Sequence, residues 1–527
     1  MGISCGKIGA SSPKSNTKLK EENKVTPFIT VLPDSKQKIE NETTLIVQKE
    51  SLVLHKELNP VESQYQLMHK LGSGSYATVY MVKHILTNTE RAMKKIFKEQ
   101  KLKQEILIKK ENEILNEIEI LKSIDHPNIV KIIELYSTPE YYYLITELCQ
   151  GGQIFNQFEK YCPFDEFHAA YIMYQLFLAV HYCHLKKIVH RDIKPQNILI
   201  DKVNNNGYFI IKVIDFGTAK LFKKDKLQKT LTGSPYYIAP ELLNGSYNEK
   251  CDLWSCGVLL YTLMTGKLPF IGEDANEVFE KIKEGKYDIN IKEFDKLSSE
   301  AKDLIRQLLI LDPEKRISLT NVFKHRFFVN KKMKEYVCGL SKEKILSCLK
   351  NIKDYKSEFA LQTTVLAFLV HNFTHHIAVK DVNNFFNVFD YQIEQADGKL
   401  TRQEVIRGLA KFMSKSDVIK NVDSIFTKID RDCNGFIEYE EFVGACIDKN
   451  IFLNSNILQH AFNFFDRDNS GFIDLHELEE VFCNGKKKTD ELRKSLKDII
   501  RSVDINRDGA IDIKEFTLMM EKIIRVN

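Results

Sequence analysis

The 527-residue sequence predicts two folded domains of different class, an α+β domain followed by an all-α domain. Short alternating runs that are typical of β-strands occupy residues 65–97, and helical patterns dominate after residue 151. Beyond residue 380, an Asp/Gly-rich loop recurs at intervals of about 37 residues, which indicates a repeat architecture. A chain of this length exceeds the size at which one hydrophobic core keeps growing, so we expect at least two cores.

Composition excludes several classes of protein. With 43% hydrophobic and 28% charged residues, the chain has the composition of a soluble protein, and its net charge of +4 gives no reason to expect nucleic acid as a partner. No apolar run reaches the roughly 18 residues that a membrane-spanning helix needs. The 11 cysteines show no framework spacing, and no N-terminal segment is typical of a secretory signal. We therefore expect a cytoplasmic, monomeric chain with reduced thiols.

Residues 1–64 are rich in Ser, Lys, Asn, Thr and Glu and show little apolar periodicity, which predicts a flexible N-terminal arm. Gly2 follows the initiator methionine and Cys5 lies close by. This pattern makes Gly2 a candidate for myristoylation and Cys5 a candidate for palmitoylation, and the pair would attach the chain peripherally to a membrane. The alternative is an unmodified tail.

A glycine-rich turn at Gly72, Ser73 and Gly74 follows a predicted strand, and its glycines let backbone N–H groups approach phosphate oxygens. The turn alone is weak support for nucleotide binding. Further motifs follow in order: Lys94 in Ala92-Met93-Lys94, Glu117 on a charged helix, and the segments 190–197 (HRDIKPQN), 215–217 (DFG) and 239–241 (APE). Over residues 65–328 this ordered set resembles the eukaryotic protein kinases.

The resemblance implies a bilobal kinase fold, with ATP and Mg²⁺ as cofactors and protein hydroxyls as substrates. It implies that Lys94, oriented by Glu117, holds the α- and β-phosphates. Asn197 and Asp215 would bind magnesium, Asp192 would orient the substrate hydroxyl, and Lys194 would touch the transferred phosphate. Backbone groups of 147–149 would bind adenine. The residues implied to contact nucleotide are Leu71, Gly72, Ser73, Gly74, Val79, Ala92, Lys94, Thr146, Glu147, Cys149, Asn197 and Asp215.

Other kinase-like motifs concern structure and regulation. Residues 252–257 and the pair Glu241 and Arg316 match internal anchors of the family rather than reacting groups. Thr230 stands at the matching activation-segment phosphosite, and Arg191 would supply part of a pocket for its phosphate. Gln153 and Gln196 replace acids that kinases with basic substrates often carry, so the substrate consensus stays open.

The repeats of the second domain carry oxygen ligands at the spacing of an EF-hand calcium loop, at positions 1, 3, 5 and 12 with glycine at position 6. Carboxylate and carbonyl oxygens suit Ca²⁺ better than zinc or iron. The predicted ligands are Asp430, Asp432, Asn434, Phe436 and Glu441; Asp466, Asp468, Ser470, Phe472 and Glu477; and Asp504, Asn506, Asp508, Ala510 and Glu515.

The first repeat is degenerate. Asp397, Gly398 and Glu404 fit positions 5, 6 and 12, but Ile393 and Gln395 would fill positions 1 and 3. We expect weak calcium binding there, or none, and a role as the packing partner of the second repeat.

A kinase domain at 65–328, a junction at 329–380 and a calmodulin-like domain with four EF-hand repeats at 381–527 resemble the calcium-dependent protein kinases. In that family the junction inhibits the kinase until calcium-loaded EF-hands bind it. The junction candidates here are the basic residues 331–334 and the apolar helical pattern of 345–370. His371, His375 and His376 lack accompanying cysteines or carboxylates, so we interpret them as a polar helix surface rather than a zinc site.

The resulting hypothesis is a calcium-activated protein serine/threonine kinase that acts in calcium signalling. A rival hypothesis is a catalytically silent, calcium-responsive scaffold, but a scaffold needs none of Lys94, Asp192 and Asp215. A third reading has the EF-hands recruiting an outside partner instead of regulating the kinase of the same chain.

Overall fold

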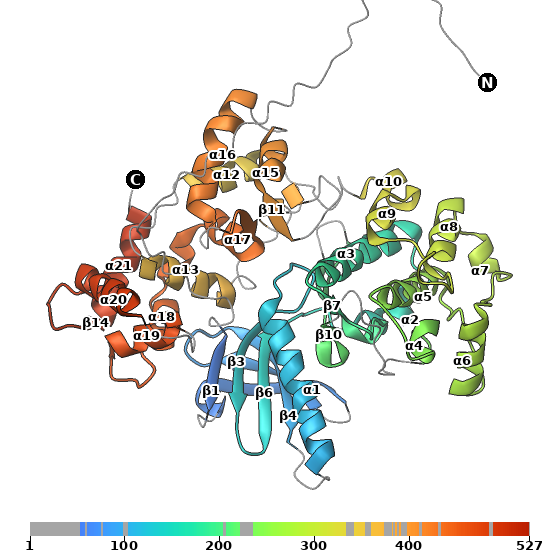
Figure 1. Cartoon of the computed structure of the whole chain (residues 1–527), viewed down its shortest axis with the longest axis horizontal. Helices are drawn as coiled ribbons and strands as arrows, with labels where there is room; N and C mark the ends of the chain where they lie inside the picture. The colour runs from blue at the N-terminus through green and yellow to red at the C-terminus, as the bar shows by residue number, and fades with distance from the viewer. Residues whose placement is uncertain are drawn as a thin grey trace, which may run out of the picture. The chain divides into compact units, whose positions relative to one another are not determined.

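The computed structural model describes residues 53–57, 61–74, 77–98, 104–203, 207–221, 235–333, 342–353, 360–373, 382, 385–386, 389–390, 398–410, 414–430, 434–483 and 489–525 (Figure 1). All of them belong to one compact unit, which comprises residues 43–527. Thr230, Asp432, Gly2 and Cys5 lie outside the described residues, as does most of the predicted N-terminal arm.

The catalytic part begins with a six-stranded sheet in the order β1-β5-β6-β4-β3-β2. Its antiparallel strands are β2 (Tyr65–Ser73), β3 (Ala77–His84), β4 (Glu90–Phe97), β5 (Ile132–Ser137) and β6 (Tyr141–Glu147). β1 (Leu54–Glu57) pairs in parallel with β5, and Val61 in the short helix η2 (Val61–Ser63) is buried. The prediction of an unstructured arm through residue 64 is therefore wrong at its C-terminal end, where the free edge of β5 supplies the pairing partner that the sequence pattern could not reveal.

The rest of the catalytic part is mainly helical, as predicted. Two long helices, α3 (Glu166–Leu185) and α5 (Cys251–Thr265), are buried along most of their length. Asp165 caps α3 by accepting hydrogen bonds from the N–H groups of Phe167 and His168, and Gly266 ends α5 with a positive φ. The other helices are α1 (Gln104–Ser123), α2 (Phe158–Tyr161), α4 (Pro240–Leu243), α6 (Ala275–Glu284), α7 (Lys292–Asp295), α8 (Ser299–Leu308), α9 (Leu319–Lys324) and α10 (Arg326–Asn330).

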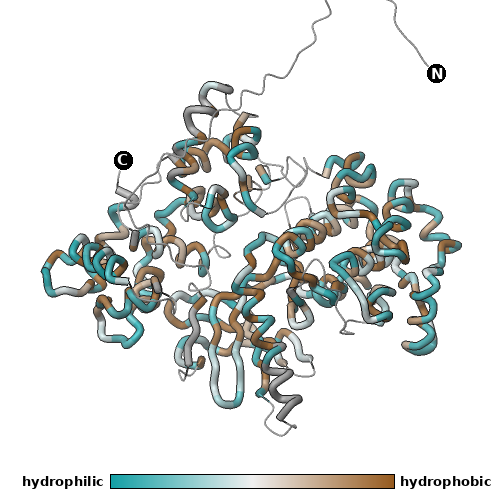
Figure 2. Tube along the Cα trace, viewed as in Figure 1, coloured by the Kyte–Doolittle hydropathy of each residue, from teal (hydrophilic) through white to brown (hydrophobic). Residues whose placement is uncertain are grey.

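The hydropathy of the chain follows this burial. Figure 2 shows apolar residues concentrated on the central strands and helices of the catalytic part, whereas peripheral helices such as α6 are largely hydrophilic. Among the described helices, none combines the length and the apolar character needed to cross a bilayer.

Two small two-stranded antiparallel sheets carry the predicted catalytic segments. β8 (Ile198–Val203) pairs with β9 (Phe209–Val213), and β7 (Ile188–Val189) pairs with β10 (Lys220–Leu221). The segment 190–197 therefore leaves β7 and ends in β8, and the segment 215–217 follows β9 directly. This connectivity brings the two motifs together even though about 20 residues separate them.

The all-α part consists of two paired EF-hand units. Short strands join the loops in each pair: β11 (Lys399–Thr401) with β12 (Phe436–Glu438), and β13 (Phe472–Ile473) with β14 (Ile511–Asp512). Phe426, Phe462 and Ile500, each four residues before a loop, are buried as helix-face spacing predicts. The helices are α15 (Arg402–Leu409), α16 (Lys415–Ile429), α17 (Tyr439–Cys446), η6 (Lys449–Leu453), α18 (Ser455–Phe465), α19 (Leu475–Cys483), α20 (Asp490–Val503) and α21 (Ile513–Arg525).

The predicted junction divides between the two parts. Met333 is buried in the kinase core, and Lys331 pairs with Glu166 at 2.8 Å. The helices α12 (Lys342–Lys353) and α13 (Ala360–Phe373) instead share one hydrophobic core with the EF-hands. The junction helices are thus part of the calcium-module core, and the kinase core extends to residue 333.

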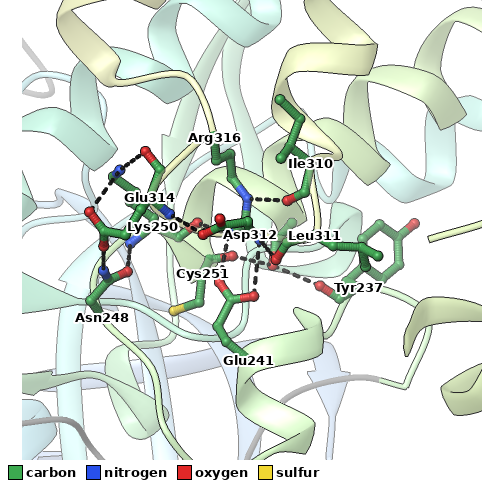
Figure 3. A network of polar contacts seen from close by, with 11 residues as sticks. Tyr237, Glu241, Asn248, Lys250, Cys251, Ile310, Leu311, Asp312, Glu314 and Arg316 are labelled. Atoms are coloured by element: carbon green, nitrogen blue, oxygen red, sulfur yellow. Dashed lines mark hydrogen bonds and ion pairs between the residues drawn. The ribbon is translucent and has the colours of Figure 1, made fainter. Parts of the chain in front are cut away.

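Glu241 and Arg316 form the buried anchor of the helical part (Figure 3). The guanidinium of Arg316 reaches both carboxylate oxygens of Glu241, at 2.5 Å and 3.0 Å, and also donates to the carbonyls of Lys250 and Ile310. It lies over the ring of Trp254, 5.3 Å from its centroid. The predicted structural role of this pair fits its burial and its many backbone partners.

We expect Arg316→Ala to destabilise the kinase domain by about 3–5 kcal/mol, because it leaves the Glu241 carboxylate buried without its cation. Urea unfolding followed by fluorescence measures this effect in the full chain, since Trp254 is its single tryptophan. Arg306→Ala on the exposed face of α8 is the matched control and should change stability by no more than about 0.5 kcal/mol. Equal unfolding midpoints for the two variants would contradict the anchor role.

Candidate active site

Lys94 on β4 lies between two carboxylates. Its Nζ is 2.7 Å from Oε1 of Glu117 on α1 and 3.3 Å from Oδ1 of Asp215, which follows β9. Burial alone would lower the pKa of Lys94, but the two carboxylates outweigh it and raise the pKa above its usual value. The ammonium therefore stays charged, as a group that holds phosphate oxygens must.

Asp215 is held in an unusual backbone conformation, with a φ of 65°. Burial would raise the pKa of its carboxyl, but Lys94 and His190 lower it below the ordinary value. Gly217 allows the close packing at this point, because a Cβ there would lie 3.3 Å from both Oδ1 of Asp215 and Oε2 of Glu117. An ionised carboxylate beside a fixed ammonium is the arrangement that a magnesium-bound triphosphate needs.

The catalytic loop gathers Asp192, Lys194 and Asn197. Oδ2 of Asp192 accepts from Nζ of Lys194 at 2.6 Å and from Nδ2 of Asn197 at 3.0 Å. Since the Asn197 amide nitrogen donates to Asp192, its Oδ1 is the atom available to a hard cation. The three side chains that the sequence predicted to act together do lie together.

Asp252 on α5 orients the backbone of this loop. Its carboxylate is fully buried and accepts hydrogen bonds from the N–H groups of His190 and Arg191, and from Nε2 of His184 at 2.8 Å. Burial would raise the pKa of Asp252, but these donors lower it. The Arg191 guanidinium, predicted to await a phosphate, donates instead to the Tyr247 hydroxyl and the Thr218 carbonyl.

The segment predicted to bind adenine begins at Glu147, the last residue of β6. The Glu147 N–H donates to the Lys131 carbonyl at 3.1 Å, so this amide is committed to the sheet. Its carboxylate is buried and accepts from the N–H of Lys131 at 2.7 Å and from Nζ of Lys212 at 2.8 Å. Of the predicted adenine contacts, the carbonyl of Glu147 and the backbone of Cys149 remain suited to the role.

The glycine-rich turn has the open geometry that the phosphate prediction requires. A Cβ at Gly72 would meet no atom within 4 Å, and the Gly74 N–H donates to the Ala77 carbonyl at 2.8 Å. Leu71 is exposed, whereas Val79, Ala92 and Thr146 are half-buried on the neighbouring strands.

The third and fourth EF-hand loops have the geometry of calcium sites. Carboxylate oxygens of Asp466, Asp468 and Glu477 lie within 4.8 Å of one another. In the fourth loop, Asp504 accepts from the N–H groups of Arg507 and Gly509, and Glu515 accepts from those of Ile505 and Asn506. The glycines at position 6 adopt φ of 87° and 91°, which a side chain would strain. These loops fit Ca²⁺ by ligand type and by backbone turn.

The second loop shows the same turn where it is described, since Asp430 accepts from the N–H groups of Asn434 and Gly435. The first repeat keeps only the framework. Glu404 there accepts from both the N–H and the hydroxyl of Thr401, at 2.7 Å each, in a capping box, and Gly398 packs against the ring of Tyr182. Residues 391–397 lie outside the described part, so the prediction of weak calcium binding in this repeat stays a prediction.

The calcium module contacts the kinase sheet through α13 and α17. His371 lies between Oε1 of Glu440, at 2.8 Å, and the carbonyl of Ile132 on β5, at 2.9 Å. Glu440 also forms an ion pair with Lys131, and its N–H donates to the Asp125 carboxylate at 3.0 Å. The interpretation of His371 as polar surface is wrong, because this ring is buried in an interdomain contact.

Comparison with known proteins agrees with both the kinase site and the calcium-binding loops. The protein kinase domain model matches residues 65–328, and the EF-hand domain pair model matches residues 456–521. Calcium-dependent protein kinase 3 of Plasmodium berghei (strain Anka) is 37% identical over 467 residues, which are 88% of this chain and 81% of the relative. Calcium-dependent protein kinase 5 of Plasmodium falciparum (isolate 3D7) is 35% identical over 481 residues, 90% of this chain and 80% of the relative.

The chain belongs to the calcium-dependent protein kinase family. It is a calcium-activated protein serine/threonine kinase that uses ATP and Mg²⁺ and binds Ca²⁺ through its EF-hands. The predictions of family, fold class and enzymatic activity are confirmed.

Sequence reasoning missed the residues that link the kinase to its calcium module. Lys131, Asp125 and Glu440 carry no motif, and Glu440 lies some 300 residues from the other two in the sequence. The one signal in the sequence for this contact is that Glu440 stands next to the predicted ligand Glu441, because a residue beside a calcium ligand moves with it.

Acidification should weaken calcium binding at the third loop. Burial raises the pKa of the Glu477 carboxyl, although N–H donors from Asp474 and Arg467 oppose the effect. A raised pKa means that protons compete with calcium for Glu477 at a higher pH than they would for an ordinary glutamate. With Glu441→Gln and Glu515→Gln leaving the third loop as the intact predicted site, calorimetry at about pH 7.5 and pH 5.5 should show a several-fold loss of affinity. Equal affinity at both values would contradict this.

Proposed function

We propose that the geometry around Asp192 performs phosphoryl transfer to a protein serine or threonine hydroxyl. This assignment depends on two groups of side chains. Lys94 contacts Glu117 and Asp215. Asp192 contacts Lys194 and Asn197. Bound ATP supplies the phosphoryl group, and bound magnesium neutralises its negative charge. Asp192 accepts the hydroxyl proton, Lys194 stabilises negative charge on the transferred group, and Lys94 holds the phosphates in line.

Calcium control acts through the junction helices. α12 and α13 are tied to the EF-hands by hydrogen bonds as well as by the shared core: Asn351 donates to the Cys446 carbonyl at 2.6 Å, and Gln362 donates to that of Met519 at 2.7 Å. Lys331, a candidate for inhibition, is held by Glu166 and not by the acids of the catalytic loop. These contacts support a mechanism in which calcium-loaded EF-hands retain the junction and keep it out of the substrate site.

The N-terminal arm and the activation segment give two further elements of the proposal. Acylation of Gly2 and Cys5 would place a cytoplasmic kinase on a membrane surface, for which the sequence pattern is the support. Phosphorylation of Thr230 would recruit Arg191 from its contacts with Tyr247 and Thr218.

The activity should depend on Asp192 and on calcium in separable ways. Asp192→Asn should lower phosphate transfer to a peptide library by about 10²–10⁴-fold, because it removes the proton acceptor. The combined Glu441→Gln, Glu477→Gln and Glu515→Gln changes should make the remaining transfer insensitive to calcium. The exposed substitutions Asp295→Asn and Glu491→Gln are the matched controls. Tight calcium binding without any transfer by the unmodified chain would favour the scaffold hypothesis.

A truncation separates inhibition within the chain from recruitment of a partner. Because Met333 belongs to the kinase core, the truncated chain should end after residue 333 rather than after 328. Inhibition by the junction predicts that this kinase is active without calcium, at a rate above that of the full chain. If the truncated kinase shows the low calcium-free rate of the full chain, the junction helices α12 and α13 are not what inhibits the kinase.

A further inference from the structure

Lys212 is a buried cation on a strand of mostly buried, apolar residues. It lies on β9, and only 6% of the residue is exposed. Its Nζ is 2.8 Å from Oε1 of Glu147, which is 1% exposed. Burial alone would lower the pKa of Lys212, but the acidic groups around it, Glu147 first among them, outweigh burial and raise the pKa. The ammonium therefore stays charged in the interior.

Stability does not explain why a charged pair stands at this point. Taking two charges out of water costs free energy that their mutual attraction returns only in part. Apolar residues of similar volume often replace a buried ion pair without loss of stability. The alternative role for such a pair is to fix one arrangement of the chain, and the segments attached to Lys212 and Glu147 indicate which arrangement that is.

Glu147 stands at the adenine end of the predicted nucleotide site. It is the last residue of β6, and the predicted adenine-binding segment is 147–149. Shortly after this segment, the Gly151 N–H donates to the Ile200 carbonyl on β8 at 2.8 Å. The small sheet of β8 and β9 therefore supports the adenine-binding segment, and Lys212 is its charged contact with Glu147.

Lys212 is also tied to the magnesium end of the site. Two residues further along the chain, the Ile214 N–H donates to the Asn197 carbonyl at 3.0 Å, and Asp215 follows directly. Asn197 and Asp215 are the two predicted magnesium ligands. One short stretch of backbone thus joins the cation that holds Glu147 to both residues that would hold the metal of a bound nucleotide.

We propose that Lys212 is a positioning residue for ATP. By holding Glu147, its ammonium sets the distance and orientation of the adenine-binding segment relative to the magnesium ligands. A ligand held at both ends in one fixed geometry binds more tightly than a ligand held at one end, because the second contact forms within a complex that already exists. This role rests on the proposed phosphoryl transfer and identifies one determinant of its affinity for ATP.

The test measures kcat and KM for ATP with the full-length chain, calcium in excess and one peptide substrate from the library. Lys212→Met should raise the KM for ATP by at least about 10-fold and lower kcat by less than about threefold, because Asp192 and the magnesium ligands are intact. Structural damage alone lowers the folded fraction, and with it kcat, at an unchanged KM. Lys202→Met, on the same small sheet, is the matched control and should behave as the unmodified chain does. An unchanged KM in Lys212→Met would overturn the positioning role.

A second variant covers the case in which Lys212→Met folds poorly, since that change leaves the Glu147 carboxylate buried without its cation. Lys212→Met combined with Glu147→Gln removes both charges and keeps an oxygen that accepts from the Lys131 N–H. This double variant should unfold near the urea midpoint of the unmodified chain and still show the raised KM for ATP. A KM equal to that of the unmodified chain would overturn the role.

Nucleotide binding separates this role from the transfer reaction. Calorimetry with Mg²⁺ and ADP, which carries no phosphoryl group to transfer, should show affinity at least about 10-fold weaker in both Lys212 variants and unchanged in Lys202→Met. Equal affinity for ADP in all variants would overturn the positioning role even if the unmodified chain transfers phosphate. Weakened ADP binding in a chain that transfers no phosphate would contradict the proposed function and support the positioning role.

Discussion

The buried carboxylate of Glu147 is the interaction on which the arrangement of the chain depends. Glu147 is the last residue of β6. Its carboxylate binds the ammonium of Lys212 on β9 and accepts a hydrogen bond from the N–H of Lys131, just before β5. A carboxylate that is 1% exposed is tolerable only with such partners, and removing one of them would leave a charge in a low-dielectric interior. The strands of the sheet and the β8–β9 hairpin of the helical part are therefore fixed to each other at the segment predicted to bind adenine.

The same point connects the kinase to its calcium module. Lys131 donates its N–H to Glu147 and pairs through its side chain with Glu440, the residue before the final ligand of the second calcium loop. His371 at the end of the junction reaches Glu440 and the Ile132 carbonyl. Glu440 on α17 is therefore connected through Lys131 to Glu147, where the predicted adenine-binding segment begins, and the junction helix α13 ends at the same contact.

The parts of this structure that the sequence predicted are those where chemistry fixes residue types at short spacing. Lys94, Asp192, Asn197 and Asp215, and the ligands of the calcium loops, are predicted by motifs of a few residues each. In the structure Lys94 contacts Asp215, Asn197 contacts Asp192, and the carboxylates of the third calcium loop lie together. Three other contacts join distant segments: the pairing of β1 with β5, the ion pair of Glu440 with Lys131, and the edge-to-face packing of the His84 and His460 rings. Tertiary packing selects such contacts, and no local pattern records them, which is why the interpretation of His371 as a polar surface is wrong.

We expect the calcium-loaded module to rest on the kinase beside Glu147. Hydrogen exchange of the full-length chain, with and without calcium, tests it most directly. Calcium should slow exchange both in α13 and α17 and at the start of β5 in the kinase. If calcium slows exchange in the EF-hands while β5 and the segment after Glu147 exchange at an unchanged rate, the module does not act through this contact.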